Sequence, residues 1–349
     1  MTLQAPFPWF GGKSRIAAQI WDRLGNPVNY VEPFFGSGAV LLSRPGGPGR
    51  TETVNDKDRF VANFWRAAAR DPEALVHWMD WPVNEVDLTA RHLWLLNEGA
   101  ARIARCDGDP DYFDAQVAGW WCWGACSWIA GGWCSGRGPW TWNGDVHEWA
   151  EGDAGRGIKR QLPHLGNAGQ GINRKLPHLG AGRGINRKLP LMEWITALSE
   201  RLRRVRVCAG DWSRVCGDTV TWRHGTTGVF LDPPYADTAG RTADLYAQDS
   251  LTVAHEAREW AIEAGRNPLM RIAFAGYQGE HTFPRDWSEL RWKAQGGYGL
   301  HGNGAGRENA ARETIWFSPA CIPPEQRGLF DVIEPEDARM EDASREGGK

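Results

Sequence analysis

The stretch that decides the fold is Val31-Glu32-Pro33-Phe34-Phe35-Gly36-Ser37-Gly38, which is followed by the apolar run Ala-Val-Leu-Leu at 39–42. The pattern predicts a short strand at 30–32, a tight turn, and the beginning of a helix. The strand ends on a carboxylate, and the two glycines allow a ligand to approach the backbone closely. The turn alone does not name the ligand, because its Gly-x-Gly lacks the third glycine of the dinucleotide fingerprint.

Similar units recur on both sides of a different middle section. Further strands are predicted at 52–54, 205–209, 228–232, 271–275 and 313–317, and helical spacing is found at 60–70 and 88–105. Strands that alternate with helices at this spacing favour an α/β fold with a mainly parallel sheet.

Composition bounds the class of protein. A chain of 349 residues suggests two domains, or one α/β domain with a large insertion. Hydrophobic residues at 42% and charged residues at 24% exclude wholesale disorder and fibrous architectures. Without a long apolar run or a secretion-type start, the sequence predicts a cytoplasmic protein with no membrane partner. The seven cysteines are sparse and odd in number, which predicts reduced thiols.

The middle of the chain, roughly 71–200, has an unusual composition. Eight of the 21 tryptophans fall between Trp120 and Trp149. A basic repeat then begins at Gly157, Gly171 and Gly184, with the form Gly-Ile-Asn-Arg-Lys-Leu-Pro in its last two copies. Its Lys and Arg residues could contact DNA phosphates, or the repeat could be an expanded linker. The basic residues of interest are Lys159, Arg160, Arg174, Lys175, Arg187 and Lys188.

The most specific motif is Asp232-Pro233-Pro234-Tyr235, which follows an apolar strand. A carboxylate and a proline-stiffened carbonyl can both accept hydrogen bonds from one exocyclic amino group, and an adjacent aromatic ring can stack on the base that carries it. The motif therefore indicates a pocket for an amino-substituted ring. A second glycine turn, Pro8-Trp9-Phe10-Gly11-Gly12-Lys13, presents one lysine near the N-terminus.

With these motifs in this order, the sequence resembles the Dam-like family of adenine-N6 DNA methyltransferases, in particular the forms found in phages and prophages. The likeness covers residues 6–65 and 205–330, and Arg312–Pro319 resembles the C-terminal strand of the family. Asp232 favours adenine, since cytosine-N4 enzymes usually have Ser there and glutamine methyltransferases have Asn.

The resemblance implies a Rossmann-like fold that uses S-adenosylmethionine, with a seven-stranded, mostly parallel sheet and one antiparallel strand near its C-terminal edge. Residues 1–70 and 201–330 would form the catalytic domain and 71–200 an inserted DNA-recognition region. The acidic stretch 331–349 would be a disordered tail.

The resemblance also implies roles for individual residues. Trp9, Gly11 and Lys13 would seat the cofactor, with Lys13 near its carboxylate, and Glu32, Phe34, Gly36 and Gly38 would form the main cofactor turn. Asp56 would accept from the ribose hydroxyls, and Asp211 would border the adenine of the cofactor. In the alternative interpretations Trp9 belongs to the core, Asp56 caps a helix and Asp211 is a turn residue.

The same resemblance places catalysis at Asp232, Pro233, Pro234 and Tyr235. The target adenine would leave the duplex, stack on Tyr235 and donate to Asp232 and the Pro233 carbonyl. The loop 236–250 is a candidate lid. The protein would act on DNA, with no obligate protein partner. A restriction partner and the target sequence stay open.

Three alternatives remain at this point. Cys122, Cys126 and Cys134 with His147 could be imagined as a zinc site, but the spacing lacks a Cys-x2-Cys pair, so no metal is expected. The enzyme could methylate RNA or another amino group with the same motif. The chain could also be a DNA-binding protein with a degenerate catalytic core.

Overall fold

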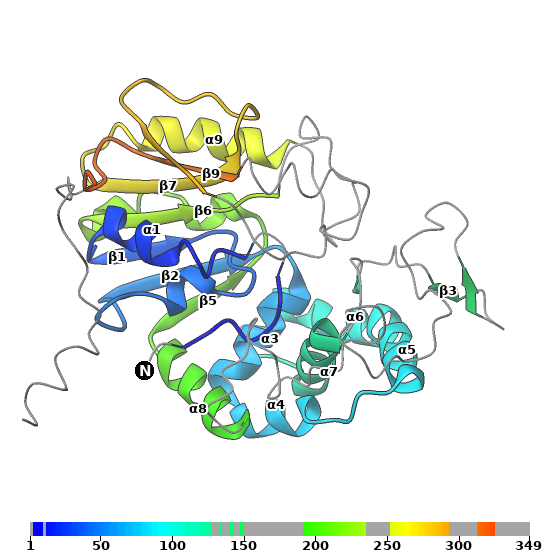
Figure 1. Cartoon of the computed structure of the whole chain (residues 1–349). Coiled ribbons are helices and arrows are strands. Elements are labelled where there is room, and N and C mark those ends of the chain that lie inside the picture. The colour runs from blue at the N-terminus through cyan, green and yellow to red at the C-terminus, as the bar shows by residue number, and fades with distance from the viewer. Residues whose placement is uncertain are drawn as a thin grey trace, which may run out of the picture.

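The computed structural model describes residues 3–9, 12–109, 111–127, 133–134, 140–142, 147–149, 191–234, 252–292 and 313–324. At its centre lies a seven-stranded sheet with the strand order β5-β2-β1-β6-β7-β9-β8 (Figure 1). Its strands are β1 (Asn29–Glu32), β2 (Thr51–Asp56), β5 (Val205–Ala209), β6 (Thr227–Leu231), β7 (Met270–Tyr277), β8 (Ser288–Arg291) and β9 (Glu313–Phe317). A separate antiparallel pair consists of β3 (Trp140–Trp142) and β4 (His147–Trp149).

The sheet is parallel except at β9, which runs antiparallel to both of its neighbours, β7 and β8. The predicted α/β class, with one antiparallel strand near the C-terminal edge, is therefore confirmed. The strands β1, β6 and β9 are buried along their whole length, because helices cover both faces of the sheet.

The helices fall into two groups. Those next to the sheet in sequence are α1 (Ala17–Leu24), α2 (Ala39–Leu42), α3 (Arg59–Arg70), α8 (Leu191–Leu202) and α9 (Val253–Ala264), with short 3-10 turns η3 (Trp212–Val215) and η4 (Trp222–His224). Those of the middle section are α4 (Pro72–Met79), α5 (Glu85–Trp94), the π-helical turn η1 (Leu95–Gly99), α6 (Ala100–Ile103), the 3-10 turn η2 (Ala104–Asp107) and α7 (Ala115–Ser127).

Successive side chains of each strand point to opposite faces of the sheet, so the core has one part on each face. On one face Tyr30 and Phe230 pack with Trp21 of α1 and with Phe64 and Leu198. On the other face Val31, Val229 and Ile272 pack with residues of α9 and η3. This core continues without a break into the helices α3, α4, α7 and α8 below the sheet (Figure 1).

Several predicted elements are confirmed, and others, among them the helices α1, α4 and α8, were not predicted. The strands at 205–209 and 313–317 and the helix at 39–42 match the predicted bounds. The edge strand β8 was missed, because it is short and half exposed. The Trp-rich run was not predicted to be helical, yet α7 is a helix that buries Trp121 and Trp123. The expected helical stretch at 88–105 is helical throughout, but it is interrupted by η1.

Within the described residues no helix is long and apolar enough to cross a bilayer. The basic repeats and the acidic stretch 331–349 lie outside the described residues.

Candidate active site

The candidate site lies where the chain reverses its direction of progress across the sheet. From β1 the chain proceeds to β2 and β5 on one side, and β6 and β7 then lie on the other. The loops after β1 and β6 therefore diverge, and in open parallel sheets ligands bind in the crevice that such diverging loops leave at the carboxyl ends of the strands. The predicted cofactor turn follows β1, and Asp232 follows β6.

Asp232 is held by a lysine from the N-terminal segment. The Lys13 ammonium lies 2.9 Å from both carboxylate oxygens of Asp232, and 3.7 Å from Oε2 of Glu313 on β9. Burial raises the pKa of Asp232, and Lys13 opposes this effect. Lys13 was expected near a cofactor carboxylate, and in the structure its ammonium contacts the Asp232 carboxylate. Pro233 is buried and Pro234 is half-buried.

The turn after β1 depends on two glycines with left-handed backbone conformations. Gly36 has a φ of 48° and Gly38 a φ of 69°. A Cβ atom on Gly36 would lie 2.5 Å from Nε1 of Trp9, so the space that the missing side chain leaves is filled by the Trp9 ring. Trp65 donates its indole N–H to the Gly36 carbonyl at 2.9 Å. The turn is thus packed between two tryptophans, and half-buried Trp9 also contacts the core, as its alternative interpretation required.

Asp56 ties the end of β2 to this turn. Its carboxylate accepts hydrogen bonds from the backbone N–H of Gly36 at 2.8 Å and from that of Asp58 at 2.9 Å. Burial, followed by the neighbouring charge of Asp58, raises the pKa of Asp56 to about 7. The residue that caps helix α3 is Asp58, which accepts from the N–H of Phe60. The helix-cap interpretation of Asp56 is therefore wrong.

Glu32 lies beneath the turn. Glu32 is 2% exposed, and its carboxyl group accepts a hydrogen bond from the Tyr30 hydroxyl at 2.8 Å. Burial raises the pKa of Glu32 well above its ordinary value, and the nearby Asp232 charge acts in the same direction. The Glu32 carboxyl group thus lies in surroundings that disfavour its ionised form. Phe34 is half-buried and stacks on Trp212, with ring centroids 6.1 Å apart.

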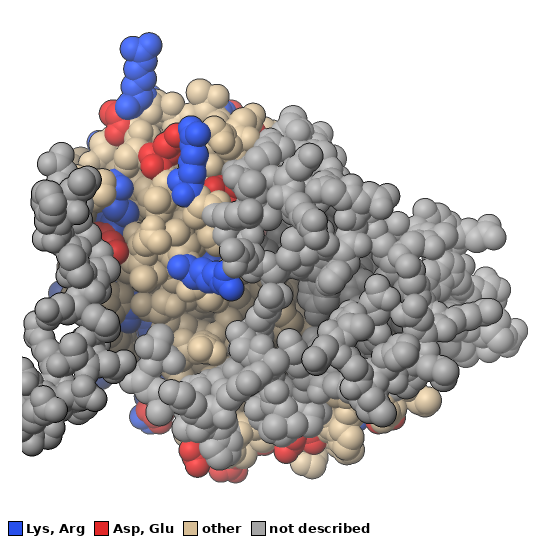
Figure 2. All heavy atoms as spheres, in the orientation of Figure 1, with Lys and Arg blue, Asp and Glu red and all other residues tan. Residues whose placement is uncertain are grey.

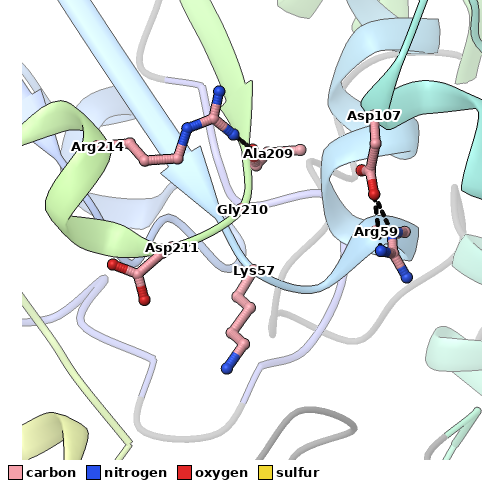
Figure 3. A pocket seen from close by; sticks show the side chains of 7 residues that line it. All are labelled: Lys57, Arg59, Asp107, Ala209, Gly210, Asp211 and Arg214. Atoms are coloured by element: carbon pink, nitrogen blue, oxygen red, sulfur yellow. Dashed lines mark hydrogen bonds and ion pairs between the residues drawn. The ribbon is translucent and has the colours of Figure 1, made fainter.

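A pocket of about 280 Å³ opens at the carboxyl ends of β2 and β5 (Figure 3). It is lined by Lys57, Arg59, Asp107, Ala209, Gly210, Asp211 and Arg214. Arg59 is turned toward Asp107, and Arg214 donates to the Ala209 carbonyl. Asp211 is exposed at the rim and accepts from the N–H and the hydroxyl of Ser213, so it is a turn residue as well as a lining residue.

One residue that connects these parts was not predicted. Asn55 is buried between the two loops, and its side-chain amide donates to the carbonyls of Pro33 and Gly210 at 3.1 and 3.0 Å. It thereby joins the turn after β1 to the pocket rim. The only available signal was an amide residue at the end of a strand, directly before Asp56. Glu313 was also missed, because its strand was recognised but no role was assigned to its first residue.

Other predicted residues lie outside the described residues. They are Gly11, Tyr235, the candidate lid 236–250 and the basic residues Lys159, Arg160, Arg174, Lys175, Arg187 and Lys188. On the described part of the face in Figure 2, Lys and Arg side chains alternate with Asp and Glu and do not form one continuous basic field.

The imagined zinc site has no support in the described part of the chain. The thiols of Cys122 and Cys126 are buried and both approach the Pro6 carbonyl, at 4.0 and 3.8 Å. Cys134 is buried as well, and its backbone N–H donates to His92. Among the described residues no group of three or more potential ligands could hold a metal ion.

Comparison with protein families agrees with this geometry. Residues 9–84 match the family of D12 class N6 adenine-specific DNA methyltransferases, and this segment contains the turn after β1, Lys13 and Asp56. The match supports the resemblance to adenine-N6 DNA methyltransferases that the motifs indicate. The matched family indicates a DNA adenine-N6 methyltransferase. A comparison with curated proteins finds no match. The Asp232 motif of this methyltransferase follows the matched segment and is placed beside it by the sheet.

Proposed function

We propose that the methyltransferase uses S-adenosylmethionine as methyl donor and transfers the methyl group to an adenine that has left the duplex. The single observation that carries the proposal is the position of Asp232. Its partly exposed carboxylate lies at the carboxyl end of β6, directly beside the turn after β1. A bound donor and an adenine amino group would meet in that crevice.

The residues present fit the proposed donor. The pocket at β2 and β5 has an acceptor at its rim in Asp211, and the buried Asn55 has an amide oxygen without a hydrogen-bond partner. Asp56 lies between this pocket and the turn, where it could accept from ribose hydroxyls. The turn at 33–38, with Trp9 beside it, would lie along the rest of the donor. When bound, S-adenosylmethionine supplies an activated sulfonium methyl group.

The protein itself supplies orientation and charge. The amino nitrogen of adenine is a weak nucleophile, because its lone pair is delocalised into the ring. Hydrogen bonds from its two protons to the Asp232 carboxylate and the Pro233 carbonyl would favour tetrahedral geometry and free that lone pair. Transfer would form the new N–C bond while the S–CH3 bond of the donor breaks and leaves S-adenosylhomocysteine, and the nitrogen would release one proton to solvent. The role of Asp232 is therefore orienting and electrostatic.

DNA binding would extend beyond this crevice. A paired adenine buries its amino group in the duplex, so the base has to be extruded, which costs a few kcal/mol. We assign stacking of the base to Tyr235 and closure to the loop 236–250. Residues 71–200 would form the target-recognition region, and the basic repeats within it would contact phosphates. These roles rest on the order of the motifs in the sequence.

The deciding experiment separates chemistry from binding. Asp232→Ala should abolish methyl transfer from labelled S-adenosylmethionine to duplex DNA, while duplex affinity in an anisotropy titration stays within a few-fold of wild type. Asp218→Ala, an exposed aspartate before β6, is the matched control and should retain activity. Equal loss of methylation and DNA binding in Asp232→Ala would contradict the assigned role.

A further inference from the structure

Three charged side chains from distant parts of the chain meet behind the crevice. Lys13 comes from the N-terminal segment, Asp232 follows β6, and Glu313 is the first residue of β9. Because β9 runs antiparallel to β7, its first residue pairs with Tyr277 at the end of β7. The reversed strand thus delivers Glu313 to the same edge of the sheet as the carboxyl ends of the parallel strands.

The three side chains differ in their access to solvent. The Lys13 side chain is 2% exposed and that of Glu313 is 4% exposed, whereas 21% of the Asp232 side chain is exposed. Asp232 is therefore the member of the cluster that a substrate can reach, and Lys13 and Glu313 can influence the reaction only through it.

The hydrogen-bonding capacity of the groups explains the arrangement. An ammonium group has three donors, and each carboxylate oxygen can accept more than one hydrogen bond. Lys13 contacts both oxygens of Asp232 at 2.9 Å and leaves lone pairs on each for a further donor. On another side of the ammonium, Glu313 lies at ion-pair distance, 3.7 Å from Nζ. Its charge favours the buried ammonium in the position that contacts Asp232.

We infer that Glu313 is a positioning residue for methyl transfer, because it holds the Lys13 ammonium against Asp232 and so keeps the Asp232 carboxylate ionised and oriented toward the adenine amino group. This inference rests on the role proposed above for Asp232. Nothing in it requires Glu313 to touch DNA or the methyl donor.

The surrounding charges agree with this role. Burial opposes the charged form of Lys13, yet Asp232 and Glu313 together raise its pKa above 10.5. Lys13 in turn lowers the pKa of Asp232, against the effect of burial. Glu32 also interacts with Asp232, and burial together with the Asp232 charge raises the pKa of Glu32 and disfavours its ionised form. Lys13 is thus the cation that keeps Asp232 ionised, and its loss from this position would raise the pKa of Asp232.

The test compares pH profiles of methylation at saturating substrates. In Glu313→Gln, kcat should fall roughly ten- to hundredfold, while KM for DNA stays unchanged. The acid limb of the profile should move to higher pH by about one pH unit, because Lys13 no longer stays against Asp232. Lys13→Met removes the cation itself and should give the largest upward shift of the acid limb. Glu313→Asp, which keeps the charge, should fall between wild type and Glu313→Gln. Glu289→Gln on the neighbouring strand β8 is the control and should resemble wild type.

The direction of the shift decides the outcome. If Glu313 acts only as a nearby negative charge, its removal lowers the pKa of Asp232 and moves the acid limb down. An acid limb at or below that of wild type in Glu313→Gln therefore overturns the inference. If Glu313→Gln does not fold, the pH profile of Glu313→Asp is used instead. An acid limb at the wild-type pH in that variant would also overturn the inference. Wild-type methylation by Asp232→Ala would instead refute the proposed role of Asp232.

Discussion

The backbone N–H of Gly36 donates to the Asp56 carboxylate at 2.8 Å, which couples the turn after β1 to the end of β2. This carboxylate is the group proposed to receive the ribose hydroxyls of the methyl donor. Its environment already disfavours the ionised form, since burial and Asp58 raise its pKa to about 7. Binding of donor hydroxyl groups should therefore change its protonation as well as its contacts.

Binding of S-adenosylmethionine should release a proton from Asp56. Hydroxyl donors favour the carboxylate over the carboxylic acid, so the pKa of Asp56 should fall in the complex. At pH 7 this corresponds to on the order of half a proton per bound donor. Calorimetry in buffers with different ionisation enthalpies measures this number directly. Asp56→Asn should abolish the release and weaken binding, and proton release that persists in this variant would assign it to another group.

The same carboxylate should make stability depend on pH. Its folded-state pKa of about 7 lies above the ordinary value of 3.8, so the folded protein binds more protons than the unfolded chain between these values. The contribution of Asp56 to the free energy of unfolding should therefore fall as the pH rises from about 4 to about 7. Denaturant titrations across this range should show a flatter pH dependence for Asp56→Asn than for wild type. Parallel curves for the two proteins would argue against a raised pKa.

Gly36→Ala should destabilise the protein more than Gly46→Ala does. Both glycines have positive φ, 48° at Gly36 and 76° at Gly46, so each alanine introduces backbone strain of about 1 kcal/mol. Only at Gly36 would the new Cβ also clash with the Trp9 ring, whereas nothing lies within 4 Å at Gly46. Chemical denaturation should give an additional loss of about 1–3 kcal/mol for Gly36→Ala. Equal losses of unfolding free energy in the two variants would show that the Trp9 ring can move aside at no cost.

Removal of Arg201 should be strongly destabilising. Its guanidinium on α8 contacts both carboxylate oxygens of Glu52 on β2, at 2.6 and 3.0 Å, and the pair is buried. Arg201→Met would break this buried pair, but Glu52 would keep its ion pair with Arg44. The loss should therefore lie near the lower end of the about 3–5 kcal/mol that an uncompensated buried charge costs. Arg203→Met removes an exposed pair with Glu200 from the following turn and should cost about 1 kcal/mol or less. Similar losses in the two variants would contradict a structural role for the buried pair.

Deletion of residues 171–183 should affect DNA affinity more than site preference. The segment carries Arg174, Lys175 and Arg183. If these contact phosphates, the slope of log affinity against log salt concentration should become shallower by up to about 3. The methylated sequence, read by sequencing modified adenines in DNA from an expressing host, should stay the same. A changed target sequence would show that the repeat reads bases.

Local chemistry determined much of this protein in advance. The apolar strands at 205–209 and 313–317, the turn around Gly36 and Gly38, and the Asp232 motif could be predicted because strand periodicity, positive φ and proline stiffness act over a few residues. The half-exposed edge strand β8 and the helix α7 were missed, because one has a weak pattern and the other is apolar on all sides.

The tertiary structure alone decided the partners of these groups. Lys13 and Asp232 are 219 positions apart, and no local rule pairs them. Asn55 reaches Gly210 only because β5 lies next to β2, and Glu313 reaches Lys13 only because β9 is reversed. Strand order and direction are set by the burial of the whole sheet between its helices. The contacts that tune the charge of Asp232 are therefore a property of the complete fold.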